Sequence, residues 1–394
     1  MLTISCNQKN KDEVILCVTG RIDTLTAEEF GKTVSAAHAE EPEAKIILNF
    51  EKVEIISSYG LRELLQFTKQ GIDYKLTNVN ADVFAVLKLS GFLNYIEIEK
   101  PLKQLSLEGC EMIGKGANAE VFRLNDEQVV KIFKRAPDID QIIRERILAK
   151  KAIMAGVPSA ISFEMAEVNG EPGLIFELIK ARSLAFQIAK DPSAIDEYID
   201  GYVEITKTTH AIDAEKDVDY PLEPAVEIFR SYIDFLEEYL DGAIIAGLRR
   251  FSACLPESTM LLHGDIQPGN VMVTKQGLLF IDMDSLTKGP SVFDLGYLYR
   301  TLILFWQVGS QESFLRFNEE CSRRLWDEFI QRYYADEDIE TVKIQKKQIE
   351  IIGLVSICRK ILKRNEKQDI ISKIKKQLQD AVSEYFENNE KEQI

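Results

Sequence analysis

The sequence predicts a mixed α/β (α+β) protein of two domains, and three observations support this prediction. Its 394 residues, 45% hydrophobic and 28% charged, have a globular composition and are enough for two or three domains of about 150 residues. Short β-branched runs alternate with helical stretches over residues 14–91. A second strand-rich region begins at residue 110 and becomes mostly helical from residue 183.

The first domain is expected at residues 1–100, where strands and helices alternate in order. The segments are 14–20, 26–40, 45–50, 60–71, 74–79 and 83–91. Thr26 stands three residues before Glu29, which is a capping-box pattern at the start of the first helix. Gly71 marks the end of the second helix, because glycine adopts the left-handed backbone at little cost.

A linker is expected at 101–109, where Pro101 interrupts a charged stretch. After it the pattern predicts three strands with a glycine-rich turn, a helix that ends before Gly156 and Pro158, and two further strands. These segments are 110–134, 138–155, 161–168 and 173–179. A strand–loop–strand block at 259–284 interrupts the helical remainder.

Charge and composition exclude several classes of protein. The formal charge of −16 leaves no broad basic surface for nucleic acid or anionic lipid. The six cysteines form no C-x-x-C pair and the three histidines have no ligand spacing, so any metal should have oxygen ligands. No basic region precedes an apolar stretch at the start, and no run of about 18 apolar residues occurs, so we expect a cytoplasmic protein with no membrane span.

The stretch LLHGDIQPGNVMVTKQGLLFIDMDS, residues 261–285, has the most informative spacing. Asp265 and Asn270 lie five residues apart in a loop, and Asp282 ends the apolar strand that follows. A loop carboxylate can accept the proton of an attacking hydroxyl, while an amide oxygen and a second carboxylate bind the Mg²⁺ of a nucleotide. The alternative interpretation is an Asx turn at the aspartate and a strand-capping asparagine.

This stretch resembles the HGDxxxxN loop and IDxD strand of kinases similar to aminoglycoside phosphotransferases and choline kinases, which are relatives of the protein kinases. The resemblance implies a two-lobed protein-kinase-like fold, with the N-lobe at 110–180 and a largely helical C-lobe at 181–394. It also implies that Asp265 is the catalytic carboxylate and that Asn270 and Asp282 hold Mg²⁺.

The stretch IGKGANAEVFRLNDEQVVKIFK, residues 113–134, resembles the nucleotide loop and lysine strand of the same family. The resemblance implies that Gly114, Gly116 and Asn118 belong to the loop over the phosphates and that Lys131 reaches them. Ala119 stands where kinases often have a third glycine. The nucleotide is expected to be ATP or GTP, with Mg²⁺.

Two further parts of a nucleotide site follow from the resemblance. Glu145, on the next helix, is expected to pair with the family's lysine; the alternative partners are Arg144, Arg146 or a surface lysine. The strand and hinge in GLIFELIKARSL imply that the backbone from Glu177 to Ile179 holds the base.

The remaining polar residues of the motifs are expected to support the site. His263 is interpreted as a structural residue of the loop rather than a base. Asp284 either assists the metal or caps the next segment, and both interpretations stay open. By resemblance, Asp294 braces the catalytic loop, and His210 is a packing residue on a helix.

The first 100 residues resemble a STAS domain of the anti-sigma-factor-antagonist type. GRIDTLTAEEF, NFEKVEIISSYGLRELLQF and LTNVNADVFAVLKLSGF carry the resemblance. Counting back from Gly60 places Ser58 at the family's phosphorylation switch, although Ser57 stands where antagonists often have aspartate. The alternative is that Ser58 only caps a helix. The domain is expected to bind a protein partner.

Together these patterns predict a phosphotransferase that uses a nucleotide and Mg²⁺ to phosphorylate a hydroxyl of a small molecule. The alternative is a non-catalytic protein that senses nucleotide and acts through its STAS-like domain. A third hypothesis is that the kinase-like part phosphorylates a serine such as Ser58. Residues 1–100 carry −4 of the net charge and the remainder −12, a balance that suits a cationic acceptor, but net charge is a property of the whole surface and not of a pocket, so the acceptor stays open.

Overall fold

The computed structural model describes residues 2–9, 12–98, 103–115, 119–134, 139–308, 315–363 and 368–391. The chain divides into two compact units, Met1–Lys103 and Gln104–Ile394. Helices and strands are mixed in both units, which confirms the predicted α/β class. In the described part of the chain, no helix has the length and apolar character needed to cross a membrane.

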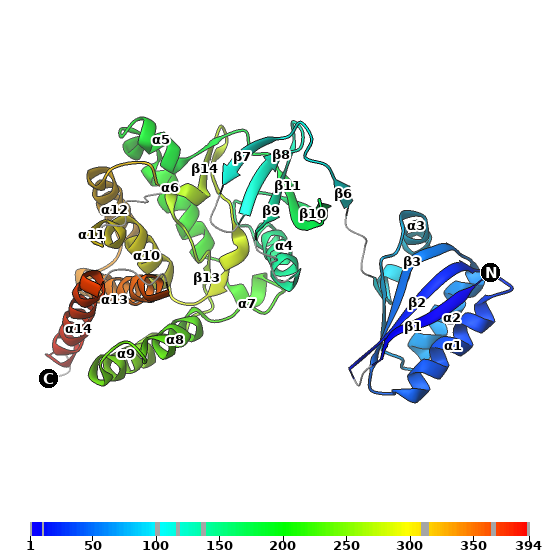
Figure 1. Cartoon of the computed structure of the whole chain (residues 1–394). Coiled ribbons are helices and arrows are strands. Elements are labelled where there is room, and N and C mark those ends of the chain that lie inside the picture. Colours follow the sequence, from blue (N-terminus) through cyan, green and yellow to red (C-terminus); the bar gives the residue numbers. More distant parts are fainter. Residues whose placement is uncertain are drawn as a thin grey trace. The chain divides into compact units, whose positions relative to one another are not determined.

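The first unit is a five-stranded sheet with helices α1 and α2 against one face (Figure 1). The strand order is β1-β2-β3-β4-β5; β1 and β2 are antiparallel and the other neighbours are parallel. Phe30, Phe50 and Phe67 are buried in edge-to-face contact between α1, α2 and the sheet. The elements are β1 (Thr3–Lys9), β2 (Glu13–Ile22), α1 (Ala27–Glu40), β3 (Lys45–Ile56), α2 (Ser58–Lys69), β4 (Tyr74–Thr77), α3 (Ala81–Leu89), the 3₁₀ turn η1 (Phe92–Asn94) and β5 (Glu97–Ile98).

Two of the predicted helix starts in this unit differ from the structure. Thr26 precedes α1 but forms no side-chain cap, because its hydroxyl donates to the carbonyl of Arg21 and accepts from the N–H of Asp23. The predicted capping box is therefore wrong. Ser57, not Ser58, caps α2: its Oγ accepts from the N–H of Tyr59 at 3.2 Å.

The second unit begins with a six-stranded sheet in the order β6-β10-β11-β9-β8-β7. Its elements are β6 (Lys103–Leu105), β7 (Glu111–Lys115), β8 (Ala119–Arg123), β9 (Gln128–Phe133), α4 (Ile139–Met154), β10 (Ser162–Val168) and β11 (Glu171–Glu177). The segment 101–109 was expected to be a linker, but β6 lies inside it and pairs with β10. The two units divide within this strand, between Lys103 and Gln104.

A largely helical lobe follows the six-stranded sheet, as the green to red parts of Figure 1 show. Its elements are β12 (Arg182–Ser183), α5 (Leu184–Lys190), α6 (Ala194–His210), α7 (Ala214–Asp217), α8 (Ala225–Leu236), α9 (Gly242–Cys254), β13 (Leu261–Leu262), η2 (Pro268–Asn270), β14 (Val271–Thr274), β15 (Gly277–Phe280), η3 (Met283–Ser285), β16 (Thr287–Lys288), α10 (Val292–Tyr299), the π-helical turn η4 (Arg300–Leu304), α11 (Phe305–Gln307), α12 (Glu319–Tyr333), α13 (Ile339–Lys363) and α14 (Gln368–Lys391). One continuous hydrophobic core joins these helices to α4.

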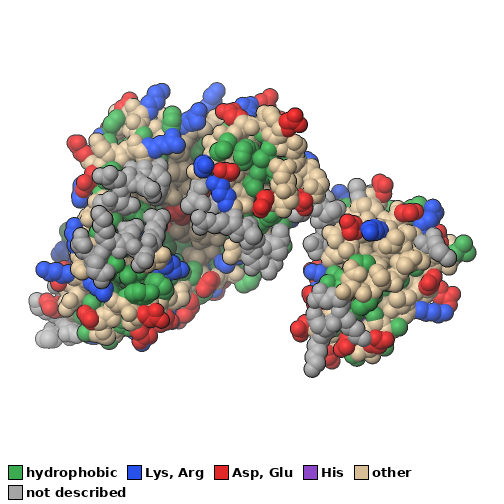
Figure 2. Space-filling model, viewed as in Figure 1, with side chains coloured by type: hydrophobic (Ala, Val, Ile, Leu, Met, Phe, Trp, Pro, Cys, Tyr) green, Lys and Arg blue, Asp and Glu red, His purple; other side chains and the backbone are tan. Residues whose placement is uncertain are grey.

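The surface charges agree with the composition. On the face shown in Figure 2, basic and acidic side chains are interspersed over each unit. The chain carries 48 Lys and Arg against 64 Asp and Glu, so acidic groups dominate its surface as a whole.

Candidate active site

A buried carboxylate holds the loop that carries Asp265. Asp294, at the start of α10, is fully buried and accepts from the backbone N–H of His263 at 2.9 Å and of Gly264 at 2.7 Å. Two charge-assisted hydrogen bonds to consecutive amides define the backbone immediately before Asp265. Asp294, 30 positions after Gly264 in the sequence, thus fixes the loop between β13 and β14.

His210 and Tyr333 extend this anchor to two further helices. Nε2 of His210, at the end of α6, lies 3.0 Å from Oδ2 of Asp294, and Nδ1 lies 2.7 Å from the hydroxyl of Tyr333 on α12. A carboxylate only accepts hydrogen bonds, so His210 donates through Nε2. The residue expected to be only a packing residue therefore also completes the hydrogen bonding of Asp294.

Gly264 lies where no other residue fits. Its φ is +83°, and a Cβ at this position would lie 2.1 Å from the carbonyl oxygen of Ser285. Both the left-handed backbone and the close approach exclude a side chain. Because the middle residue of the HGD sequence is glycine, η3 can pack closely against the loop.

Hydrogen bonds from two amide side chains orient the carboxylate of Asp265. Its Oδ2 accepts from Nδ2 of Asn270 and from Nε2 of Gln267, both at 2.9 Å, and Nδ2 of Asn270 also donates to the backbone carbonyl of Asp265. Within the described parts of the chain, no hydrogen bond is recorded for Oδ1 of Asp265. That oxygen is available for a proton from an incoming group.

His263 supports the loop rather than the chemistry. Its side chain is fully buried and packs against Phe280, and its Nδ1 accepts from the N–H of Asp265 at 3.3 Å. These contacts join His263 to its own loop and to β15.

Lys131 on β9 lies between two carboxylates from opposite sides of the cleft. Its Nζ is 2.8 Å from Oε1 of Glu145 on α4 and 2.6 Å from Oδ1 of Asp282. Glu145 thus has Lys131 as its partner rather than Arg144 or Arg146. Burial lowers the pKa of Lys131, but the nearby carboxylates outweigh it and hold that pKa well above its usual value.

The charge in this cluster is unbalanced. Burial raises the pKa of Glu145 to about 7, although Lys131 opposes the shift. The side chain of Asp284 is open to solvent on one side. Desolvation of its carboxyl group by the surrounding protein, together with the charge of Asp282, raises its pKa as well. Three carboxylates share one ammonium group here, so further positive charge would be stabilised.

The same carboxylates present oxygen atoms suited to a divalent cation. One oxygen each from Glu145, Asp282 and Asp284 lie within 4.8 Å of one another. Asp282 has a left-handed backbone with φ +69°, a conformation that aspartate tolerates better than most residues. Hard oxygen ligands of this kind fit Mg²⁺.

A cavity of about 210 Å³ opens beside this cluster, between the sheet and the helical lobe. Lys131, Glu145 and Asp282 form its polar end, and the rest is mostly apolar: Ile113, Val121, Val129, Ala160, Phe176, Glu177, Leu178, Ile179, Met272, Ile281 and Met283. A flat aromatic base fits such a lining, with its phosphates toward the lysine.

The predicted hinge lies along this cavity. The side chain of Glu177 accepts from the N–H of Ile161 at 2.7 Å, and the N–H of Leu178 donates to the carbonyl of Glu127. No backbone hydrogen bond within the described segments uses the N–H of Ile179. Gly114 lies in β7, whereas Gly116 and Asn118 lie outside the described residues.

Sequence reasoning missed residues that the folded loop brings into contact. Gln267 lies within the HGD motif and contacts Asp265, yet glutamine at this position carries no chemical signal of its own. The hydroxyl of Tyr202, fully buried on α6, donates to the carbonyl of Ile266 from 64 positions away. No local pattern predicts such a contact.

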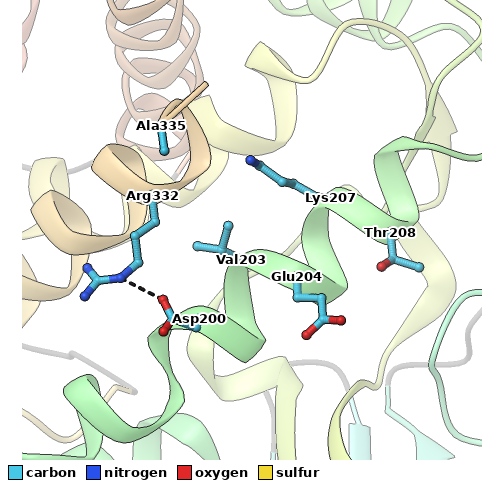
Figure 3. A pocket seen from close by; sticks show the side chains of 7 residues that line it. All are labelled: Asp200, Val203, Glu204, Lys207, Thr208, Arg332 and Ala335. Carbon is cyan, nitrogen blue, oxygen red and sulfur yellow. Dashed lines mark ion pairs between the residues drawn. The ribbon is translucent and has the colours of Figure 1, made fainter. Parts of the chain in front are cut away.

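A second pocket lies on the outside of the helical lobe, between α6 and α12 (Figure 3). It measures about 420 Å³ and mixes charges of both signs; its lining is Asp200, Val203, Glu204, Lys207, Thr208, Arg332 and Ala335. Arg332 points to Asp200, with Nε 2.8 Å from the carboxylate. None of the residues predicted to act on a nucleotide lines this pocket.

In the first unit, Ser58 is the first residue of α2 and is exposed. Tyr59 beside it is also exposed, and the guanidinium of Arg62 lies 5.1 Å from its ring centroid. The N-cap interpretation of Ser58 is wrong, because Ser57 caps the helix. The hydroxyl of Ser58 is therefore accessible beside a helix N-terminus.

Comparison with known proteins gives two matches along the sequence. Residues 109–328 match the sequence model described as "Phosphotransferase enzyme family", and residues 6–105 match that of the STAS domain. No relative among curated proteins matches the chain significantly.

Solved structures that match the chain include the GDP complex of a mutant aminoglycoside 2'-phosphotransferase-IIIa, with 15% identity, a TM-score of 0.49, and coverage of 79% of this chain and 100% of that one. The GDP and kanamycin complex of APH(2")-IIIa has 14% identity and a TM-score of 0.49, over 76% and 98% of the two chains. A choline/ethanolamine kinase family protein from Mesorhizobium loti has 14% identity and a TM-score of 0.47, over 70% and 89%.

Proposed function

The chain belongs to the phosphotransferase enzyme family, and we propose that it transfers the γ-phosphate of ATP or GTP to a hydroxyl group of a small molecule. The observation that carries the proposal is the convergence of Lys131, Glu145 and Asp282 at the polar end of an apolar cavity. Burial and Asp282 raise the pKa of Asp284, and the charge of Asp265 adds to that shift, which supports a site shared by the loop carboxylate and this cluster.

The nucleotide would lie with its base along Glu177–Ile179 and its phosphates at Lys131. The free N–H of Ile179 is suited to an acceptor nitrogen of the base. Asn270 and Asp282 would hold Mg²⁺, which when bound neutralises charge on the phosphates. Asp284 would assist from beside Asp282, in keeping with the spacing of their oxygens.

The chain's own residues would act by position and charge. Asp265 would accept the proton of the attacking hydroxyl, with Asn270 and Gln267 holding its other oxygen. Asp294 would keep the loop in place through two backbone amides. Such catalysis depends on alignment of the acceptor with the phosphate rather than on a covalent intermediate.

A pair of variants tests the proposal. Asp265→Asn keeps the shape of the side chain but cannot accept the proton, so we expect a loss of transfer of at least about 100-fold with nucleotide binding retained. Turnover is measured across a panel of hydroxyl acceptors, and binding by the shift in melting temperature with Mg-ATP or Mg-GTP. The exposed Asp234→Asn serves as a control.

Full turnover in Asp265→Asn would contradict the assignment. Binding of nucleotide by the unmodified chain without transfer to any acceptor would favour the alternative, a nucleotide-sensing regulatory protein. Mass spectrometry of the same incubations reports whether phosphate appears on Ser58, the candidate switch of the STAS domain.

For the STAS domain we infer a protein partner that binds around the start of α2. The exposed Ser58 and Tyr59 support this inference, because both lie at a helix N-terminus, where the positive end of the helix dipole favours an anionic group. The scattered cysteines fit a reducing cytoplasm as the place where the protein works.

A further inference from the structure

Two arginines and two tyrosines from different helices meet in the helical lobe. Nη1 of Arg300 in η4 donates to Oγ of Ser356 on α13 at 2.6 Å, and its guanidinium carbon lies 5.2 Å from the ring centroid of Tyr297. The guanidinium carbon of Arg359, one turn after Ser356, lies 4.1 Å from the ring centroid of Tyr232 on α8. Burial raises the pKa of Tyr297, and the neighbouring Tyr232 adds to the shift, so the two pairs are neighbours.

Neither arginine of this cluster has a carboxylate partner within the described residues. Arg249, Arg324 and Arg332 elsewhere in the same lobe each form ion pairs with aspartate or glutamate. Nε of Arg300 is buried and has no hydrogen-bond partner in the described structure. A buried guanidinium N–H without an acceptor is costly, so the position favours an anion supplied from outside.

The backbone that presents Arg300 is unusual. Residues Arg300–Leu304 form a π-helical turn at the end of α10, a conformation that is rare and is often found at functional sites. Gly296 and Gly353 let α10 and α13 approach closely, since a Cβ on Gly353 would lie 3.0 Å from the carbonyl oxygen of Gly296. The two arginines are thereby held on rigid, closely packed elements.

The local charge supports the same conclusion. Residues 359–363 of α13 and 370–376 of α14 carry six Lys or Arg and no Asp or Glu, in a chain whose net charge is −16. Such a segment attracts anions even though the surface as a whole repels them.

A continuous helical segment, α10 followed by η4, connects the cluster to the residue that holds the loop of Asp265. Arg300 follows Asp294 by six residues along one helix, which corresponds to a rise of about 9 Å at 1.5 Å per residue. Asp294 binds the backbone next to Asp265. The two ends of one helical segment therefore carry Arg300 and the residue that holds the backbone beside Asp265.

We propose that Arg300 and Arg359, with Tyr232 and Tyr297, bind a phosphate or carboxylate group of the acceptor, so that the substrate is an anionic hydroxyl compound. This inference rests on the proposed phosphotransferase function and names its substrate class. It replaces the cationic acceptor that the overall charge favoured, because a binding site depends on local charge rather than net charge.

Matched small acceptors test the inference with the full-length chain. Glycerol 3-phosphate carries a phosphate group and glycerate carries a carboxylate, whereas glycerol is neutral and choline is cationic. We expect transfer to both anionic compounds. The compound with the higher transfer rate shows whether the site prefers phosphate or carboxylate. Arg359→Gln and Arg300→Gln should raise KM for that acceptor by about 10- to 100-fold, with KM for the nucleotide unchanged.

Two controls separate this inference from the proposed function. Arg324→Gln removes an exposed arginine of the same lobe and should leave every KM unchanged. Binding of glycerol 3-phosphate and glycerate without nucleotide is measured by calorimetric titration, and Arg359→Gln should abolish it even if Arg300→Gln fails to fold. Transfer only to choline or glycerol, or anion binding that survives in Arg359→Gln, would overturn the inference while leaving phosphotransferase activity intact.

Discussion

Single residues at the catalytic loop are selected by backbone geometry as much as by chemistry. Gly264 has a left-handed backbone against Ser285, and Asp282 has one at the end of β15. Lys131 and Glu145 show that spacing alone can predict a contact when the two residues lie on neighbouring elements. By contrast, the choice between Ser57 and Ser58 as the helix cap depended on a one-residue shift that sequence patterns do not resolve.

Gly264→Ala should disrupt the loop without removing any catalytic group. The added Cβ would overlap a backbone oxygen at 2.1 Å and meet a φ of +83°, so the loop must move. We expect a loss of about 3 kcal/mol in the free energy of unfolding and loss of most transfer, measured by urea denaturation and by turnover.

Gly242→Ala is the matched control, because Gly242 is the first residue of α9 and nothing lies within 4 Å of its added Cβ. This variant should have unchanged or slightly higher stability. Equal stability of the two variants would show that the close approach at Gly264 is not a constraint on the loop.

At the scale of elements, α6, α10 and α12 act together to hold the loop. His210 on α6 bonds Asp294 at the start of α10, and Tyr333 on α12, 123 residues after His210, bonds the other ring nitrogen of that histidine. The strands and helices of the N-lobe followed their sequence patterns, whereas the π-helical turn after α10 did not, because tertiary packing rather than local propensity selects it.

Two variants test how much the hydrogen bonds Tyr333–His210 and His210–Asp294 contribute to stability and to kcat. Tyr333→Phe loses one hydroxyl and should cost about 1 kcal/mol. His210→Phe removes one of the three donors to a fully buried carboxylate and should cost about 3 kcal/mol. The free energy of unfolding and kcat are measured for both variants.

Tyr239→Phe, which removes an exposed hydroxyl, is the control and should change neither quantity. A kcat for His210→Phe equal to that of the unmodified protein would mean that the histidine contributes only to stability.

At the scale of the whole molecule, two units with separate cores should respond differently to nucleotide. The first unit has its own hydrophobic cluster, and the second has another that extends through the helical lobe. Both tryptophans of the chain, Trp306 and Trp326, belong to the second unit. Tryptophan fluorescence therefore reports the unfolding of that unit alone.

Mg-ATP at about 100 times its Kd should stabilise the second unit by about 2.7 kcal/mol, which raises its melting temperature by about 4 °C. We expect this shift in tryptophan fluorescence, while circular dichroism, which detects both units, should show a second transition that does not move. Coincident transitions that shift together would contradict independent unfolding of the two units.

The sequence by itself determined the two-part organisation and both family resemblances, and it predicted Asp265, Asn270, Asp282 and Lys131 as residues of the site. It could do so because these features depend on local spacing and on residue types that carry chemistry. The family matches at residues 6–105 and 109–328 confirm the resemblances.

Only the tertiary structure decided which distant side chains meet. Lys131 contacts Asp282 across 151 residues, and Arg300 contacts Ser356 across 56, through helices and strands whose packing no local pattern specifies. The net charge of −16 describes the whole surface and does not determine the charge of an acceptor bound in one site. Electrostatic recognition depends on the few groups that folding places around a ligand.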